Sequence, residues 1–350
     1  MMSKDHPGLI ALIGSGETTR SGGQVFERFI KNYPSGSRIA VLETPAGFEL
    51  NSPAVADRVA DYLRNRLQNY EPTVEIIPAR RRGTDLSPDN PLVIQPMAEA
   101  SLLFMGPGSP SYAVRQLRGS LAWELMRAKF RQGTSLALAS AAAVAFGKFS
   151  LPVYEIFKVG EDPHWLEGLD FLSPFGLETV IIPHWNNKEG GDELDTSHCF
   201  MGKSRFEELY GLLPESVTVV GIDELTTLVI DLTGERCDVM GSGQVHLIRE
   251  GTENTFEPRT SFEISEMGDF RSIGKPDKWS ANIEQMLVEC EPDSGQVIIP
   301  PDVITLADER QRARDRTDWK AADRFREQIE SLGWQITDTP EGPVLQLRNN

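Results

Sequence analysis

The sequence predicts an α/β protein with a mostly parallel, doubly wound sheet and a small C-terminal helical hairpin. Across the first 250 of its 350 residues, short apolar runs alternate with amphipathic segments. Most of these runs are apolar throughout, as strands that are buried on both faces must be. This pattern is typical of parallel strands that are covered by helices on both sides.

The apolar runs predict strands, and the segments between them predict helices. The expected strands are residues 9–13, 38–42, 74–77, 101–105, 135–139, 179–182, 217–221 and 227–231. The expected helices include residues 23–32, 54–69 and 112–130. Ser109 is a suitable N-cap for the last of these helices, and Pro110 fits its first turn.

The final third of the chain has a different texture, polar and dotted with prolines. We expect three parts: a domain over residues 1–255, a partly helical linker over 256–300, and a helical hairpin over 301–350. A helix is expected in the linker at residues 281–290. The helices of the hairpin are expected at 302–316 and 319–332, because apolar residues such as Trp319, Ala322, Ile329 and Leu332 recur there at helical spacing.

Composition and charge narrow the functional classes. With 52 acidic and 35 basic residues, the formal net charge is -17, which argues against sequence-independent binding to nucleic-acid phosphates or to an anionic membrane. The cysteines Cys199, Cys237 and Cys290 lie far apart without CxxC spacing, so neither a disulfide framework nor a zinc site is indicated. The first apolar stretch is shorter than the core of a signal peptide. We therefore expect a cytoplasmic protein with no cofactor, no metal and no membrane partner.

Ser140 is the first candidate for chemistry. In open parallel sheets, catalytic groups collect beyond the carboxyl ends of the strands. The run LALASAAAVAFG leads from an apolar strand into Ser140, three alanines and a predicted helix. A serine at such a tight turn presents its hydroxyl above the sheet, and small neighbours leave room for a substrate. The alternative is a small buried serine that begins a helix.

The turn FMGPGSPS offers backbone hydrogen-bond donors. It follows the expected strand at residues 101–105 and contains Gly106 and Gly108. Free N–H groups in such a turn, together with that of Ala141, are suited to an oxyanion hole, and glycine permits close approach. The alternative is a plain turn between a strand and a helix.

A serine nucleophile needs a base, and the chain has five histidines. His184, in TVIIPHWNN, follows the expected strand at residues 179–182 and belongs on the same rim of the sheet as Ser140. His198, in a polar stretch, is the second choice, and His164 is the third. The alternative for any one histidine is a structural role.

An acidic partner would hold the imidazole in its useful tautomer. Glu155, in LPVYEIFKVGED, and Glu224, in VVGIDELTTLVI, are the candidates. The residues themselves do not choose between them.

Six segments together resemble the motifs of a known peptidase family. The family is that of the S51 peptidases, which includes dipeptidase E and cyanophycinase. The segments resemble its motifs in order and spacing, and they are LIGSGE, FMGPGSPS, ASAAA, IIPHW, GKSRFEEL and VVGIDELTTLVI. The resemblance spans most of residues 8–250 and implies a class I glutamine amidotransferase-like, flavodoxin-like sheet. It also implies a serine peptidase that acts next to aspartate, with Ser140 as nucleophile and His184 as base. Glu155 stands at the spacing of the dipeptidase acid, and Glu224 matches the glutamate of cyanophycinases.

Two residues near the serine depart from that family. Ala142 stands where the family usually has glycine, and Leu138 stands where it has a small residue. An added methyl group at a position that needs unusual backbone angles costs about 1 kcal/mol or more. The resemblance identifies no residue that holds the aspartate, and Arg115 and Arg205 are only guesses.

The last fifty residues resemble a different family. The run from IPPDVITLADER to DTPEGPVLQ is similar to the C-terminal helical hairpin of cysteinyl-tRNA synthetases, which lies beside their anticodon-binding region. The HIGH-like and KMSKS-like signatures of those enzymes are absent from the sequence, so we do not expect the protein to charge tRNA. Arginines and acidic residues are interleaved along both helices, which fits a solvated helix pair as well as an RNA-binding face.

Two functional hypotheses follow. The first is a serine hydrolase of the S51 type that cleaves a small peptide or amide through an acyl-enzyme. The second is a catalytically degenerate binding module whose hairpin contacts tRNA or protein. Either hypothesis leaves open whether the protein forms a homodimer. A glutamine amidotransferase is disfavoured, because Ser140 stands where that class needs cysteine.

Overall fold

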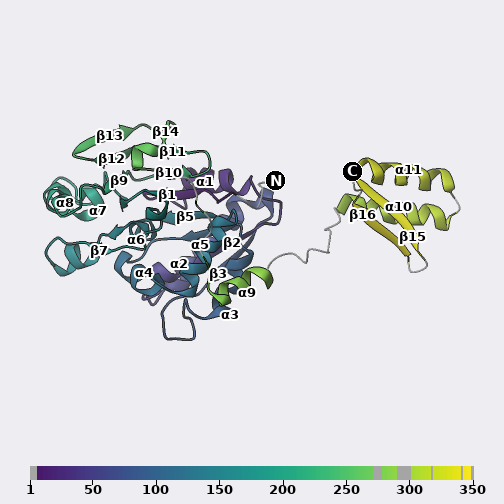
Figure 1. Ribbon diagram of the computed structural model, residues 1–350, viewed down its shortest axis with the longest axis horizontal. Coiled ribbons are helices and arrows are strands. Elements are labelled where there is room, and N and C mark those ends of the chain that lie inside the picture. Colours follow the sequence, from purple (N-terminus) through teal and green to yellow (C-terminus); the bar gives the residue numbers. More distant parts are fainter. Residues whose placement is uncertain are drawn as a thin grey trace. The chain divides into compact units, whose positions relative to one another are not determined.

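The computed structural model describes residues 6–271, 274, 278–289, 301–316, 318–339 and 342–347. The chain divides into two units, Met1–Leu287 and Val288–Asn350. Each unit is described by itself (Figure 1). Within the described ranges, no helix has both the length and the apolar character that crossing a bilayer requires.

An eight-stranded sheet forms the centre of the first unit, in the order β14-β11-β10-β1-β5-β4-β2-β3. Its parallel part consists of β1 (Ile10–Ile13), β2 (Arg38–Leu42), β3 (Thr73–Ile77), β4 (Leu102–Met105) and β5 (Ser135–Ala139). Burial along the whole of β1, β4 and β5 explains why β1 and β4 are apolar throughout and why β5 is apolar after Ser135. Antiparallel strands extend the sheet beyond β1: β10 (Thr226–Asp231), β11 (Arg236–Gly241) and β14 (Ser261–Glu263).

A second sheet has the order β13-β12-β9-β8. In it, β8 (Thr179–Ile182) and β9 (Thr218–Ile222) are parallel, whereas β12 (Val245–Arg249) and β13 (Thr252–Phe256) are antiparallel additions. A separate small pair consists of β6 (Phe149–Ser150) and β7 (Leu166–Glu167). Two of the expected strands, β8 and β9, thus belong to this second sheet and not to the large one. In addition, β14 lies where we expected a linker.

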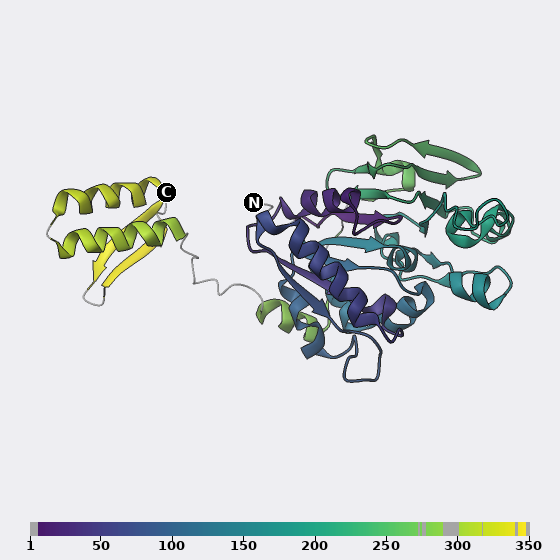
Figure 2. The same ribbon diagram turned by 180° about the vertical axis from the view of Figure 1, so that it is seen from behind.

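Helices cover both faces of the large sheet (Figures 1 and 2). On one face, α1 (Arg20–Ile30) and α2 (Ser52–Arg66) bury Phe26, Phe29 and Leu63 against β1, β2, β4 and β5. On the other face lie α5 (Leu121–Arg131) and α6 (Ala141–Phe146), joined by an edge-to-face contact between Trp123 and Phe146. The remaining helices of this unit are α3 (Pro91–Ile94), α4 (Pro110–Leu117), α7 (Ser197–Phe200), α8 (Gly202–Gly211) and α9 (Ala281–Glu289).

The single helix expected at residues 112–130 is wrong, because α4 and α5 are separate. Gly119 lies between them with a φ of +67°, a conformation that ends a helix. Ser120 then caps α5 by accepting a hydrogen bond from the N–H of Trp123 at 3.2 Å. Ser109 caps α4 as expected.

A buried carboxylate fastens α1 to the antiparallel edge of the sheet. Asp238 of β11 accepts hydrogen bonds from Arg28 of α1, from Arg236 at 2.6 Å and from Ser261 at 2.6 Å. Burial alone would raise the pKa of Asp238, but the hydrogen bonds from Arg236, Ser261 and Arg28 outweigh it and lower the pKa to about 2. The carboxylate is therefore charged over the whole neutral range.

The second unit contains two helices and a β-hairpin. The helices α10 (Pro301–Asp315) and α11 (Trp319–Ser331) agree with the expected pair, but β15 (Trp334–Thr339) and β16 (Gly342–Leu347) pair antiparallel after them. A purely helical hairpin over residues 301–350 is therefore wrong. The small core, of Val303, Ala307, Ile329, Trp334 and Ile336, needs the strand as well as the helices. Alternation of apolar and polar residues from Trp334 onward is the strand signal that the helical reading missed.

Candidate active site

Ser140 lies at the carboxyl end of β5, immediately before α6. Its φ of 51° and ψ of -115° fall outside the regions that L-residues normally occupy. The turn is fixed on both sides: the N–H of Ser140 donates to the Ile13 carbonyl at 3.1 Å, and its own carbonyl accepts from the N–H of Val144 at 3.1 Å. A strained residue that the surrounding backbone holds in place is characteristic of functional sites.

The unusual backbone angle falls on Ser140 and not on the alanine that departs from the family pattern. Ala142 lies inside α6, fully buried, and is not among the residues with positive φ. Its methyl group therefore carries none of the backbone penalty that the sequence suggested.

His184 follows β8 and faces Ser140. Its Nε2 lies 2.9 Å from the Ser140 Oγ, and its Nδ1 lies 3.2 Å from an Oε1 of Glu224. Glu224 also accepts a hydrogen bond from the side-chain amide of Asn187 at 2.9 Å. A carboxylate at Nδ1 places the ring proton there and leaves Nε2 free to accept the serine proton. Ser140, His184 and Glu224 are thus linked in series by side-chain hydrogen bonds.

The first strand of the protein braces the loop that carries Glu224. The N–H of Gly14, just beyond β1, donates to the Thr226 carbonyl at 2.8 Å, and the Ser15 hydroxyl accepts from the N–H of Leu225 at 3.0 Å. A Cβ on Gly14 would lie 2.1 Å from the Asp223 carbonyl oxygen, so only glycine permits this close approach. The end of β1 thus helps to set where the carboxylate stands.

Gly108 and Ala141 line one cavity together with Ser140 and His184, as an oxyanion hole would require. Gly108 has a φ of +149°, and a Cβ there would lie 2.1 Å from the Pro45 carbonyl oxygen. The turn is therefore packed tightly onto the backbone of Pro45. Gly106 instead lines a different, small cavity, so the structure does not bring it to the serine.

The other two candidate histidines lie elsewhere. The ring of His198 stacks on Phe206 with centroids 4.5 Å apart and meets the edge of Trp185 at 4.2 Å. Burial lowers the pKa of His198. His164 is partly exposed and lies 3.8 Å from Glu161. His184 is the candidate base that the structure places at Ser140.

The structure also separates the two candidate acids. Glu155 begins the π-helical turn η4 (Glu155–Val159), and its Oε2 is buried with no hydrogen-bond partner among the described residues. Glu224 is the acid in contact with His184. Neither Arg115, whose guanidinium lies 5.2 Å above the Tyr112 ring, nor Arg205 is among the residues that line the serine cavity.

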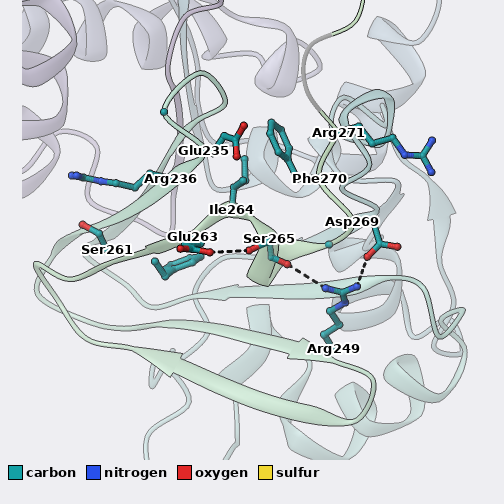
Figure 3. A pocket seen from close by; sticks show the side chains of 13 residues that line it. Glu235, Arg236, Arg249, Ser261, Glu263, Ile264, Ser265, Asp269, Phe270 and Arg271 are labelled. Atoms are coloured by element: carbon teal, nitrogen blue, oxygen red, sulfur yellow. Dashed lines mark hydrogen bonds and ion pairs between the residues drawn. The ribbon is translucent and has the colours of Figure 1, made fainter.

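A larger hollow of about 940 Å³ lies against β11, β12 and β14 (Figure 3). Its Arg249 is already paired with Asp269 at 2.7 Å and donates to the Ser265 carbonyl at 3.2 Å. No histidine is among the described residues that line it, so its serines have no imidazole base such as the one that faces Ser140. In the same described ranges, no three His, Cys, Asp or Glu side chains are grouped as metal ligands would be.

Sequence reasoning missed the residues that support the acid. Asn187 donates to Glu224, and the side-chain oxygen of Asn186 accepts from the N–H of Glu224 at 2.9 Å. The two asparagines follow His184 and Trp185 in the run PHWNN, and a polar pair just beyond a buried strand was the available signal.

Comparison with known proteins supports the fold of the first unit, and it finds relatives of a different kind for the C-terminal end of the chain. No family model matches the chain. The crystal structure of a peptidase from an acI-B1 Actinobacterium is similar with a TM-score of 0.60 and 20% identity, over 75% of this chain and 98% of that one. The first unit therefore shares the α/β fold of that structure.

The curated relatives are of another kind. A cysteine–tRNA ligase of Methanosarcina mazei is 46% identical over 48 residues, which are 14% of this chain and 10% of that protein. Cysteine–tRNA ligase 1 of Burkholderia lata is 50% identical over 49 residues, with the same shares. The chain thus spans about a tenth of the length of these relatives. These matches agree with the resemblance at the C-terminal end.

Proposed function

We propose that the first unit is a serine hydrolase of the S51 type that cleaves a peptide or amide bond through an acyl-enzyme. The observation that carries the proposal is the contact of 2.9 Å between the Ser140 Oγ and the His184 Nε2, with Glu224 behind the ring. The peptidase-like fold of the solved neighbour supports it.

The geometry suits a two-step reaction. The Ser140 Oγ attacks the carbonyl carbon while His184 takes the hydroxyl proton, and the N–H groups of Gly108 and Ala141 receive the oxyanion. His184 then gives the proton to the departing amine as the carbon–nitrogen bond breaks. A water molecule, deprotonated by the same imidazole, hydrolyses the ester and restores the serine. Glu224 holds the ring and offsets the positive charge that forms on it.

A fluorophosphonate probe tests this proposal, because it reacts covalently with activated serines. We expect labelling of the full chain, mapped to Ser140 by peptide mass spectrometry, and none in Ser140→Ala. His184→Asn should lose labelling as well, whereas His164→Asn is the matched control and should keep it. A folded wild-type protein that resists the probe would contradict the proposal and favour the degenerate binding module.

For the second unit we propose a contact with tRNA, because the relatives that match this part of the chain are named cysteine–tRNA ligases. Several cations are already engaged inside the unit: Arg326 pairs with Glu330 at 3.1 Å, and Arg314 lies over the Trp319 ring. Arg312 and Arg324 are exposed and are the better candidates for phosphate contacts.

Filter binding with bulk tRNA over a salt series tests this contact. Binding should weaken steeply as salt rises, because phosphate contacts release counterions. A variant with both Arg312→Glu and Arg324→Glu should bind at least tenfold more weakly, while Arg58→Glu on the first unit should not. Equal binding by the two variants would refute the contact.

A further inference from the structure

The cavity beside Ser140 is apolar where it meets the reacting groups. Its volume is about 240 Å³, and its buried lining includes Ala141, Val144 and Val153. The rings of Phe157 and Phe200 form one wall, with centroids 5.3 Å apart.

This aromatic wall reaches the base. The Phe200 ring is 6.1 Å from the imidazole of His184, so the hollow opens directly beside the atoms that would react. A substrate residue next to the bond being cleaved therefore has its side chain within reach of this hollow. The volume is smaller than the roughly 300–1,000 Å³ of pockets for drug-sized ligands, and suits one side chain.

The polar groups in the lining are mostly uncharged at neutral pH. Burial raises the pKa of the Cys199 thiol to about 12, and burial, with smaller contributions from Glu49 and Cys199, raises the pKa of the Tyr154 phenol. Both groups keep their protons near pH 7. Neither can balance a negative charge brought into the hollow.

Two ionic side chains complete the lining, and both are exposed. They are Lys158 and Glu189, of opposite sign. The ammonium group of Lys158 lies 4.6 Å above the Phe157 ring, on which it already has a favourable contact. No arginine is among the described residues that line the cavity. A carboxylate in this hollow would lose hydration without gaining the bidentate partner that usually replaces it.

We propose that this cavity selects a neutral, apolar side chain, of about the size of leucine or phenylalanine, on the substrate residue adjacent to the scissile bond. The inference rests on the proposed function of Ser140, whose substrate class it names. An apolar side chain gains from leaving water here, and an acidic one loses. The site is thus built for a different residue from the aspartate that the family resemblance implies.

Diphenyl phosphonates of single amino acids test the inference on the full chain. The serine oxygen forms a bond to phosphorus as phenoxide leaves, so the labelling rate reports how well each side chain is placed. Probes with leucine, phenylalanine, aspartate and lysine side chains are compared by intact mass, with a plain fluorophosphonate as reference. We expect the leucine and phenylalanine probes to react at least tenfold faster than the aspartate probe.

Variants place the selection in this cavity. Phe157→Arg puts a guanidinium into the wall and should lower the leucine-to-aspartate ratio at least tenfold. Val159→Arg is the matched control, because Val159 is on the same turn, 73% exposed and outside the lining. It should leave the ratio within about threefold. Lys158→Met should also leave the ratio within about threefold, and a tenfold rise would show that Lys158 receives an acidic side chain there.

The outcomes separate the inference from the function on which it rests. If the plain probe labels Ser140 but aspartate reacts as fast as leucine, the selection is wrong and the hydrolase stands. An unchanged ratio in Phe157→Arg, with normal labelling by the plain probe, would also overturn the inference, because the side chain would then bind elsewhere. If no probe labels a folded protein, both proposals fail.

Discussion

Glu224→Gln tests which carboxylate serves the imidazole. Glutamine keeps the shape of the side chain but removes the negative charge that lies 3.2 Å from the His184 Nδ1. Opposite charges about 4 Å apart attract by about 1 kcal/mol in water and by about 4 kcal/mol at an effective dielectric constant of 20. Because the Glu224 side chain is 36% exposed, we expect about 2 kcal/mol, which is about a thirtyfold slower reaction.

Glu155→Gln is the matched control, since it is the other acid that the family resemblance permits. The buried Oε2 of Glu155 has no partner among the described residues, and we expect the labelling rate to change by less than about threefold. The assay is the second-order rate of fluorophosphonate labelling at pH 7.5, with urea unfolding of each variant to exclude loss of fold. A larger loss in Glu155→Gln than in Glu224→Gln would refute the assignment.

Three further predictions concern stability. Gly108→Ala should lower the free energy of unfolding by at least about 3 kcal/mol in urea titrations, because the added Cβ would lie 2.1 Å from the Pro45 carbonyl oxygen. Gly119→Ala is the control: Gly119 also has a positive φ but lies in open space, so the substitution should cost only about 1 kcal/mol. Equal costs for the two variants would contradict the tight packing at Gly108. The carboxylate of Asp238 has its pKa lowered to about 2, so its contribution is complete above the unfolded value near 3.8 and is lost as pH falls through about 2. Asp238→Asn should therefore cost about 2 kcal/mol at pH 7 and show a smaller fall in Tm between pH 4 and pH 2, and parallel Tm curves would refute this. Trp334→Ala should destabilise the second unit by about 3–5 kcal/mol, seen as new proteolysis within residues 301–347 with Ser140 labelling unchanged; a protease-resistant variant would show that the strand is not needed.

The parallel part of the fold was predictable because burial on both faces leaves a local mark. The run before Ser140 is apolar from residue 136 onward, and β5 is buried throughout. Pairing between distant strands leaves no such mark, so the division of β8 and β9 into a second sheet did not follow from the sequence. The break between α4 and α5 was visible in principle, since Gly119 and Ser120 are a stop signal followed by a cap.

At the site, the rule about strand ends predicted that Ser140 and His184 lie on the same rim of the sheet. Ser140 and His184 each follow a buried strand, and the structure places their side chains in contact. The same rule about strand ends could not choose the acid. Glu155 is the candidate closer to Ser140 along the chain, but Glu224 is the one that contacts His184 in space. Contacts that depend on how a loop folds back, such as that of Asn187, are set by tertiary packing alone.

The brace at Gly14 and Ser15 has a consequence for how the reactive centre comes into being. A chain that lacked its first fifteen residues would still contain the nucleophile, the base and the acid, yet the turn at Leu225 would lose the two hydrogen bonds that it forms with Gly14 and Ser15. Such a fragment should lose the activity of the site although it keeps every reacting atom. The contacts that set the site therefore join segments that lie more than two hundred positions apart in the sequence.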